Sequence, residues 1–298
     1  MYEYAIVLIK KGKAFACSMT PEQNHEFRRQ GKPSPFRNRP IEENLRIFEG
    51  MRKGLYEEGE VCLKLKIDYK HDNANMRDPP CYRIRYTPHP HCGDKWCIYP
   101  LYDYTHGISD SIEGITHSLC TLEFEIRRDL YYWILDALEI YKPYVWEFSR
   151  LNISNNVLSK RKLHKLVHKK IVNGWDDPRI YTLNGLRRRG YTADSINAFC
   201  DYVGVTRRGN ENMVSYKLLE HCIKLDLDDK AFRTMCVSEP IRLIFTNVEH
   251  DFKEEITINQ IPKDPSKGKR TIKLTKEIWI DKSDVSFQPN SWQRIGAG

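Results

Sequence analysis

The side chains with the clearest chemical potential are the basic residues of the segment 150–189. Only Asp176 and Asp177 oppose their positive charge, in a chain whose formal net charge is +8. A field of one sign favours a polyanionic partner, and nucleic acid is the first candidate. A basic face that only keeps the protein soluble is an equally open interpretation. The cations are Arg150, Lys160, Arg161, Lys162, Lys165, Lys169, Lys170, Arg179, Arg187, Arg188 and Arg189.

A second group of reactive side chains combines cysteine and histidine in residues 81–97. Its spacing matches none of the paired patterns of structural zinc sites, so we favour no metal here and keep zinc as the alternative. The chain has 9 cysteines, an odd number, which favours reduced thiols over disulfides. The members of the group are Cys81, His89, His91, Cys92 and Cys97.

Composition excludes several classes of protein. Of the 298 residues, 40% are apolar and 30% are charged, the balance of a globular protein and not of a disordered or fibrous one. The apolar run at residues 4–9 is far shorter than the roughly 20 residues that span a bilayer. Glu3 precedes this run, where a secretory signal would be basic. We therefore expect a cytoplasmic protein with no membrane partner.

Helical periodicity in the first part of the chain predicts three helices, which begin near Tyr4, Thr20 and Ile41. Gly12 should end the first helix. The second begins with a capping box, in which a threonine and a glutamine three residues later satisfy each other's backbone amides. The third should run to about Lys53.

Alternation of apolar and charged residues predicts half-buried strands at 61–67 and 82–86. If both strands lie in one sheet with their apolar sides inward, their basic residues share the outer face and could meet phosphates. Lysines that only keep a sheet soluble explain the pattern equally well. The basic residues are Lys64, Lys66, Arg83 and Arg85.

Strand and helix signals then alternate, as in a nucleotide-binding α/β unit. Residues 96–99 indicate a buried strand, 111–119 the start of a helix, and 127–138 a clear helical face. Signals are mostly helical over residues 163–225, and β signals follow residue 238.

Four segments carry a resemblance to a known family. Residues 148–162 contain Val157-Leu158-Ser159-Lys160-Arg161-Lys162. They resemble the mobile lysine loop of class I aminoacyl-tRNA synthetases, in the form found in the glutamine and glutamate enzymes. Residues 96–106 with 110–121 resemble the second nucleotide-fold half of glutaminyl-tRNA synthetases. Residues 174–179 and 185–190 resemble the same family further on, and the likeness covers about residues 2–284.

The resemblance implies that Lys160 is the catalytic residue, as the second lysine of the loop motif. When an amino-acid carboxylate attacks the α-phosphate of ATP, a flexible cation can follow the growing negative charge into the transition state. Mg²⁺ would accompany ATP as part of the substrate, without a tightly bound cofactor. The implied ATP contacts are Thr121, Arg150, Leu151, Leu158, Ser159 and Lys160.

Tyr102 and His106 are similar to residues that line the glutamine pocket of the family. From the residues alone, both could be core side chains with satisfied hydrogen bonds. Some family members carry an aspartate that helps to recognise the acceptor stem of the tRNA, at the position where this chain has Ile126. The resemblance therefore does not indicate how this chain would recognise those base pairs. A loop similar to the family's tRNA contacts comprises Thr206, Arg207, Arg208, Gly209, Asn210, Glu211, Asn212 and Met213.

The resemblance also implies an α/β fold with four parts. These are an acceptor-end-binding inserted domain at 1–101, the second half of a Rossmann-type catalytic fold at 102–147, the lysine loop with a helical stem-contact domain at 148–237, and the start of an anticodon-binding β-barrel at 238–298. The family's first half-fold, with its His-x-Gly-His motif, should precede residue 1. We therefore expect a gene fragment or a truncated polypeptide that is inactive on its own.

The function that the resemblance implies is ATP-dependent attachment of glutamine to its tRNA, by a monomer. Its nearest rival is a eukaryotic-type glutamyl-tRNA synthetase, which shares the lysine-loop segments. Tyr104-Thr105-His106 favours glutamine, because the glutamate relatives differ at the histidine. The other alternative is a non-catalytic tRNA-binding module that has lost the chemistry.

Overall fold

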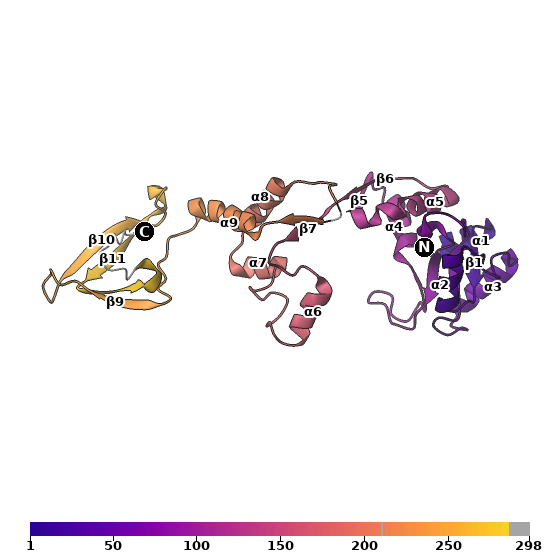
Figure 1. Cartoon of the computed structure of the whole chain (residues 1–298), viewed down its shortest axis with the longest axis horizontal. Helices are drawn as coiled ribbons and strands as arrows, with labels where there is room; N and C mark the ends of the chain where they lie inside the picture. The colour runs from indigo at the N-terminus through magenta and orange to yellow at the C-terminus, as the bar shows by residue number, and fades with distance from the viewer. Residues whose placement is uncertain (210, 286–298) are drawn as a thin grey trace. The chain divides into compact units, whose positions relative to one another are not determined.

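The computed structural model describes residues 1–209 and 211–285, which form a mixed α/β structure (Figure 1). The chain divides into two compact units. Unit 1 comprises Met1–Leu151 and Val205–Asn212, and unit 2 comprises Asn152–Gly204 and Met213–Gly298. Among the described helices, none combines the length and the apolar character that crossing a membrane requires.

The helices of unit 1 are α1 (Tyr2–Lys10), α2 (Pro21–Gln30), α3 (Ile41–Arg52), α4 (Tyr102–Ile112) and α5 (Arg128–Leu138). Its strands are β1 (Ala14–Cys17), β2 (Cys62–Leu65), β3 (Pro80–Ile84), β4 (Ile98–Pro100), β5 (His117–Thr121) and β6 (Tyr144–Phe148), with short 3₁₀ turns at Ala74–Met76 and Leu122–Arg127.

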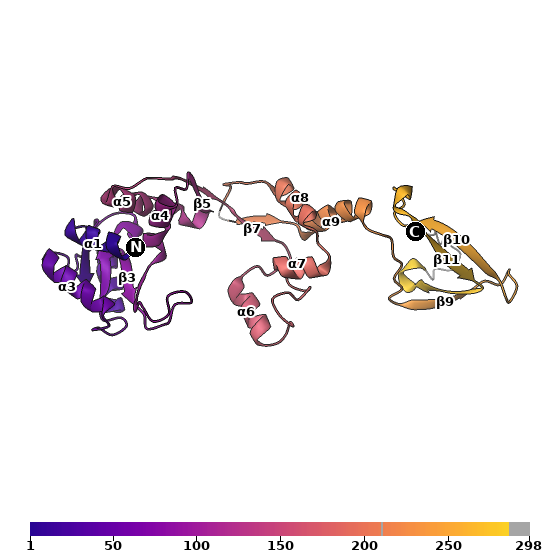
Figure 2. The same ribbon diagram turned by 180° about the vertical axis from the view of Figure 1, so that it is seen from behind.

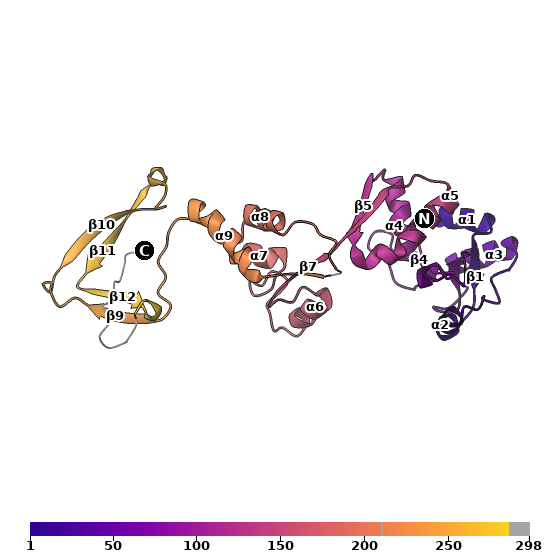
Figure 3. The ribbon, with the colours of Figure 1, turned by 45° about the horizontal axis from the view of Figure 1, so that its top comes forward.

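The first sheet of unit 1 has the order β1-β2-β3-β4 with antiparallel neighbours. All four residues of β1 are buried, because both faces of the strand are covered. Ala14 and Ala16 belong to the core that includes α1 and α3, whereas Phe15 and Cys17 pack with Phe27 of α2. Figure 3 shows α2 and the α1–α3 pair on opposite sides of β1.

The prediction that Lys64 lies on an outer, phosphate-facing side of this sheet is wrong. Lys64 is only 5% exposed, and its Nζ donates a hydrogen bond to Asn24 Oδ1 of α2 at 3.2 Å. The same ammonium lies 5.9 Å from the centre of the Phe15 ring. Helix α2 covers the face that the strand pattern assigned to solvent, while Arg83 and Arg85 are exposed as expected.

The three predicted helices of the first part of the chain are confirmed. The capping box of α2 is complete, with Thr20 accepting from the amide of Gln23 and the Gln23 side chain accepting from the amide of Thr20. Gly12 follows α1 with a φ of +65°, a conformation that glycine adopts without strain.

The second half of unit 1 contains a parallel pair, β5 and β6, connected through α5. The helix predicted over 127–138 is confirmed by α5, but the helix predicted to start at residue 111 is wrong. Helix α4 ends at Ile112, Gly114 turns the chain with a φ of +67°, and β5 follows. The polar residues of α4 obscured its apolar period in the sequence.

Unit 2 contains the helices α6 (Lys160–His168), α7 (Leu183–Arg189), α8 (Ala193–Val203) and α9 (Tyr216–Lys230). Its last part consists of the antiparallel pairs β10–β11 and β12–β9, seen from behind in Figure 2. The β signals after residue 238 are confirmed, although the sequence pattern missed the first strand of the β10–β11 pair. These strands are β9 (Pro240–Ile244), β10 (Lys253–Asn259), β11 (Lys269–Thr275) and β12 (Glu277–Asp281). The chain passes between the units through β7 (Arg150–Ile153) and β8 (Glu211–Val214), which pair with each other.

A tight turn precedes α7 and is organised by Asp177, which is 1% exposed. Its carboxylate accepts from the amide of Asn173 and from both the amide and the side chain of Arg179. These donors, the Arg179 guanidinium first, hold the pKa of Asp177 well below its usual range. A Cβ added to Gly185 would lie only 2.3 Å from the carbonyl oxygen of Ile180. The backbone of the turn therefore approaches position 185 so closely that only glycine fits there.

Candidate active site

Helix α4 presents a stripe of polar side chains on one face. Tyr102, His106 and Asp110 follow one another at intervals of four residues, which places them on the same side of a helix. The opposite face carries Tyr104 and Ile108, which are buried in the core of unit 1. The core therefore fixes the orientation in which the polar stripe is held.

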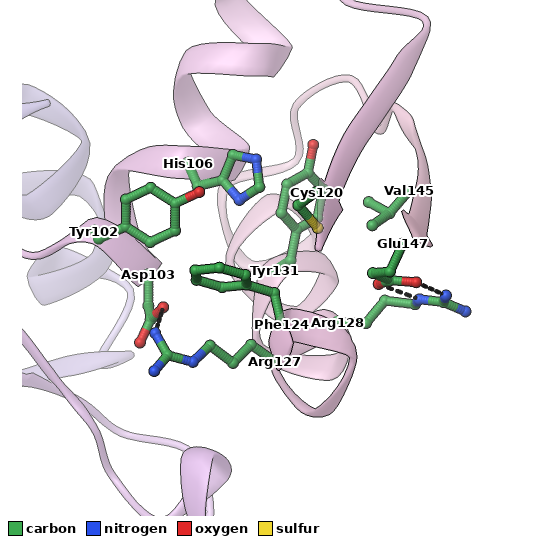
Figure 4. Close-up of a pocket in the computed structure, with 10 residues that line it drawn as sticks. All are labelled: Tyr102, Asp103, His106, Cys120, Phe124, Arg127, Arg128, Tyr131, Val145 and Glu147. Atoms are coloured by element: carbon green, nitrogen blue, oxygen red, sulfur yellow. Dashed lines mark hydrogen bonds and ion pairs between the residues drawn. The ribbon is translucent and has the colours of Figure 1, made fainter. Parts of the chain in front are cut away.

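The stripe borders a pocket of about 320 Å³, part of it open to solvent (Figure 4). Tyr102 and His106 lie side by side in it, with ring centres 5.2 Å apart. The pocket is lined by Tyr102, Asp103, His106, Cys120, Phe124, Arg127, Arg128, Tyr131, Val145 and Glu147.

Tyr131 of α5 closes the inner side of this pocket. Its ring meets the ring of His106 edge to face, with centres 5.3 Å apart. Gly107 makes this contact possible, because a Cβ there would lie 3.2 Å from the Tyr131 ring. The Tyr131 hydroxyl is protonated at neutral pH, as tyrosines ordinarily are, and burial raises its pKa further, so it can donate a hydrogen bond.

A carboxylate behind the pocket gathers three polar groups. Asp110 Oδ2 accepts from the hydroxyl of Ser118 at 2.6 Å and from that of Tyr131 at 3.1 Å. It also lies 3.3 Å from Nε2 of His106. Ser118 Oγ is 3.3 Å from the same nitrogen. His106 is thus held by groups from α4, α5 and β5.

Both arginines that line the pocket are paired with carboxylates. Arg127 lies 2.6 Å from Asp103, and Arg128 forms a two-pronged ion pair with Glu147, which is fully buried. Figure 4 shows both pairs. Burial, with a smaller contribution from Glu147, raises the pKa of the neighbouring Cys120 thiol to about 11, so this thiol is neutral. The pocket therefore presents aromatic rings and neutral donors and acceptors between internally balanced charges.

Of the residues that the resemblance connects with ATP, Thr121, Arg150 and Leu151 belong to unit 1. Thr121 is the last residue of β5, and Arg150 opens β7. The guanidinium of Arg150 lies 2.8 Å from Glu123 and its side chain is 53% exposed. An exposed pair of this kind is weakly held, which leaves the arginine able to exchange its partner for a phosphate.

Leu158, Ser159 and Lys160 belong to unit 2 and lie at the beginning of α6. Ser159 occupies the N-cap position without a capping hydrogen bond from its side chain. The first turn of the helix contains Lys160 and two further cations, and no acidic residue. A helix N-terminus with exposed lysines is suited to bind phosphate oxygens.

The resemblance connects the loop between α8 and β8 with tRNA, and this loop combines anchored and exposed residues. Ser149 anchors the loop, because its backbone amide donates a hydrogen bond to the carbonyl oxygen of Thr206 and its hydroxyl donates one to the carbonyl oxygen of Gly209. Arg207 lies 2.5 Å from Glu125 and 4.6 Å from the centre of the Trp146 ring.

Arg208 and Met213 are exposed in the same region of the chain. Glu211 and Asn212 begin β8, and Asn210 lies outside the described residues. Arg207 is therefore engaged in an ion pair with Glu125, whereas the Arg208 side chain is exposed and forms no ion pair with the described residues.

The cysteine and histidine group of residues 81–97 is not assembled as a metal site. The Cys81 thiol faces the carbonyl of Leu63, and that of Cys97 faces the carbonyl of Met51. Across residues 1–209 and 211–285, no three histidine, cysteine or carboxylate side chains come together in an arrangement that could hold a metal ion.

The sequence pattern did not single out Asp110, Ser118 and Tyr131 as site residues. Asp110 could have been found from its four-residue spacing after His106. Ser118 and Tyr131 come from other elements, so no local signal marks them.

Two family models match the chain. Residues 1–229 match the model described as tRNA synthetases class I (E and Q), catalytic domain. Residues 231–298 match the model described as tRNA synthetases class I (E and Q), anti-codon binding domain.

Individual proteins show the same similarity. The chain is 53% identical over 290 residues to a probable glutamine–tRNA ligase of Dictyostelium discoideum, covering 97% of this chain and 37% of that protein. It is 50% identical over 304 residues to a glutamine–tRNA ligase of Vibrio campbellii, covering 100% of this chain and 54% of that protein. A solved glutamate–tRNA ligase of Elizabethkingia meningosepticum aligns with a TM-score of 0.48 at 16% identity, over 76% of this chain and 52% of that one. The chain spans about half or less of the length of these relatives.

Proposed function

Because the chain belongs to the class I tRNA synthetases for glutamate and glutamine, we propose that the product of its gene attaches glutamine to tRNA. ATP and glutamine would first give glutaminyl-adenylate and pyrophosphate, and the glutaminyl group would then pass to the terminal ribose of the tRNA. Mg²⁺ enters with ATP as part of the substrate. Two relatives named as glutamine–tRNA ligases, with 53% and 50% sequence identity, support glutamine as the amino acid.

The charge balance of the pocket is the observation that carries the choice of glutamine. A glutamate side chain would bring a negative charge, but Arg127 and Arg128 are already paired with Asp103 and Glu147. Placing an additional carboxylate beside these pairs would leave a charge uncompensated, which is costly in a partly buried site. Tyr102 and His106 offer a hydroxyl and an imidazole, which suit the donors and acceptor of a neutral amide.

For the reaction with ATP, we assign Lys160 the role of the mobile cation. Leu158 and Ser159 would contact ATP beside it, and Thr121, Arg150 and Leu151 would do so from unit 1. The cationic, acid-free first turn of α6 supports this assignment, because negative charge on the phosphoryl oxygens grows as the carboxylate attacks.

For tRNA, we propose that Thr206 to Met213 touch the nucleic acid and that a monomer binds it. The four-part division at residues 101, 147 and 237 remains our proposal for the domains. It comprises an acceptor-end domain, half of a Rossmann-type fold, a stem-contact region and the beginning of a β-barrel. The matches to a catalytic and an anticodon-binding model end at residue 229 and begin at residue 231, which supports a division in this part of the chain, close to residue 237.

The choice of amino acid can be tested by exchange of pyrophosphate into ATP, with tRNA present. With the complete product of the gene, we expect kcat/KM for glutamine to exceed that for glutamate at least 100-fold, as one uncompensated charge of ~3 kcal/mol would produce. A preference for glutamate would assign the protein to the glutamyl branch. Binding of tRNA without exchange for either amino acid would indicate a non-catalytic module.

The contact with tRNA can be tested through salt. If exposed cations meet phosphates, log Kd should rise linearly with log salt, by about 0.9 for each phosphate neutralised. Arg208→Ala should lower this slope by about 1. Lys142→Ala removes an exposed cation outside the proposed contact and should leave the slope unchanged. A salt-independent Kd would contradict a phosphate-tracking surface.

A further inference from the structure

The hydrogen bonds around His106 determine which of its ring nitrogens carries the proton. The hydroxyl proton of Ser118 points to Asp110 Oδ2 over 2.6 Å, so Ser118 Oγ presents a lone pair to His106 Nε2 at 3.3 Å. The Tyr131 hydroxyl likewise gives its proton to Asp110. Both polar neighbours of Nε2, the serine oxygen and the Asp110 carboxylate, are therefore acceptors.

Two acceptors around one ring nitrogen require that this nitrogen be the donor. In a neutral imidazole only one nitrogen carries hydrogen, so Nδ1 is then left with a free lone pair. Figure 4 shows the second ring nitrogen of His106 on the side of the Tyr102 hydroxyl, and both residues line the pocket. In its neutral form, the His106 ring therefore presents an acceptor to the pocket and not a donor.

We propose that Asp110 is a specificity-determining positioning residue, which holds the His106 proton on Nε2 so that Nδ1 accepts a hydrogen bond from the side-chain amide of glutamine. This inference rests on the proposed function. A glutamine side chain ends in an amide nitrogen with two hydrogens to donate, whereas an ionised glutamate side chain has only lone pairs. An acceptor at Nδ1 attracts the first and repels the second, which provides discrimination through an unfavourable contact.

Asp110 suits this task because a carboxylate at neutral pH can only accept. An asparagine in its place could turn its amide towards His106 and donate to Nε2, which would move the ring proton to Nδ1. Asp110→Asn keeps the size of the side chain and changes mainly this property. Tyr131→Phe removes one donor to Asp110 and should weaken the same arrangement to a smaller degree.

The proton position can be measured on the 298-residue chain without any assay of activity. Long-range ¹H–¹⁵N correlation spectra distinguish a protonated from an unprotonated imidazole nitrogen for each histidine. We expect His106 to be protonated at Nε2 in the unmodified chain and to shift towards Nδ1 protonation in Asp110→Asn. Protonation at Nδ1 in the unmodified chain, or an unchanged spectrum of His106 in the variant, would overturn the inference.

The effect on specificity can be measured in the complete product of the gene. Asp110→Asn should lower the glutamine-to-glutamate ratio of kcat/KM about 10- to 100-fold, the effect of one misdirected hydrogen bond in a partly buried site. The loss should appear mainly in KM for glutamine. Asp136→Asn removes an exposed carboxylate from α5 outside the pocket, so its ratio should equal that of the unmodified enzyme.

The two hypotheses fail in different ways. An unmodified enzyme that activates neither amino acid would contradict the proposed function, and the spectra would then decide on the proton position alone. An unmodified enzyme that prefers glutamine, together with a folded Asp110→Asn variant of unchanged preference, would overturn the role of Asp110 and leave the proposed function intact.

Discussion

Replacing Lys160 with alanine is expected to slow formation of the adenylate by about 10²- to 10³-fold, the usual effect of removing one group that stabilises transition-state charge. The reason is that the lysine opens α6 with an exposed side chain and would meet the α-phosphate only when negative charge has grown there. Binding of glutamine should change little, since the pocket residues Tyr102 and His106 do not depend on it. The loss should therefore fall on kcat and not on KM.

The measurement is single-turnover formation of adenylate by the complete product of the gene, with tRNA present. Lys142→Ala serves as the matched control, because it removes an exposed lysine from unit 1 without touching the proposed site. An equal loss in glutamine affinity and in rate would mean that Lys160 holds substrate or structure and does not act in the transition state.

Gly185→Ala is expected to destabilise the region around α7 by about 3 kcal/mol, the upper part of the usual range for overpacking. The added methyl group would lie 2.3 Å from the carbonyl oxygen of Ile180 and 2.7 Å from that of Asp177. Both oxygens belong to the backbone of the turn that the buried Asp177 organises, so neither can move aside cheaply.

Hydrogen exchange of the amides of α7 provides the measurement, with the urea midpoint of unfolding as a second one. Gly50→Ala is a matched control in another helix, where the added methyl would meet the end of the Tyr56 ring at 2.8 Å. That ring can turn away, so Gly50→Ala should have a much smaller effect. Unchanged exchange in α7 of the Gly185→Ala variant would show that the turn is more yielding than its geometry indicates.

Elements with local signals could be predicted from the sequence. Helix α2 follows from its capping box, and α5 follows from its apolar face, because both signals depend only on residues close together in the chain. The prediction for Lys64 was wrong because its burial depends on α2, whose residue Asn24 lies 40 positions earlier in the chain. Strand propensity and the alternation of apolar and charged residues depend on neighbours in the sequence, so they cannot show that a distant helix covers one face of a strand.

The candidate site shows the same division. Roles for Tyr102, His106 and Lys160 could be proposed because they stand within segments that resemble a known family, and the structure places the first two in one pocket. The bonds among Asp110, Ser118 and Tyr131 could not be predicted, because they depend on how α4, β5 and α5 meet in space. Helix α4 itself was missed for a related reason: its polar stripe faces the pocket, which reduces the contrast between an apolar and a solvent face.

The spacing on α4 also has a consequence for inheritance. Tyr102, His106 and Asp110 are encoded within one short stretch of codons, so a single recombination event can transfer this wall of the pocket intact. Ser118 and Tyr131 are encoded further downstream and can be separated from it. A crossover between α4 and these downstream residues would combine His106 from one parent with the hydroxyl-bearing residues Ser118 and Tyr131 from the other. Hybrid genes with breakpoints between residues 112 and 131 should therefore lose amino-acid fidelity more often than hybrids with breakpoints before residue 102.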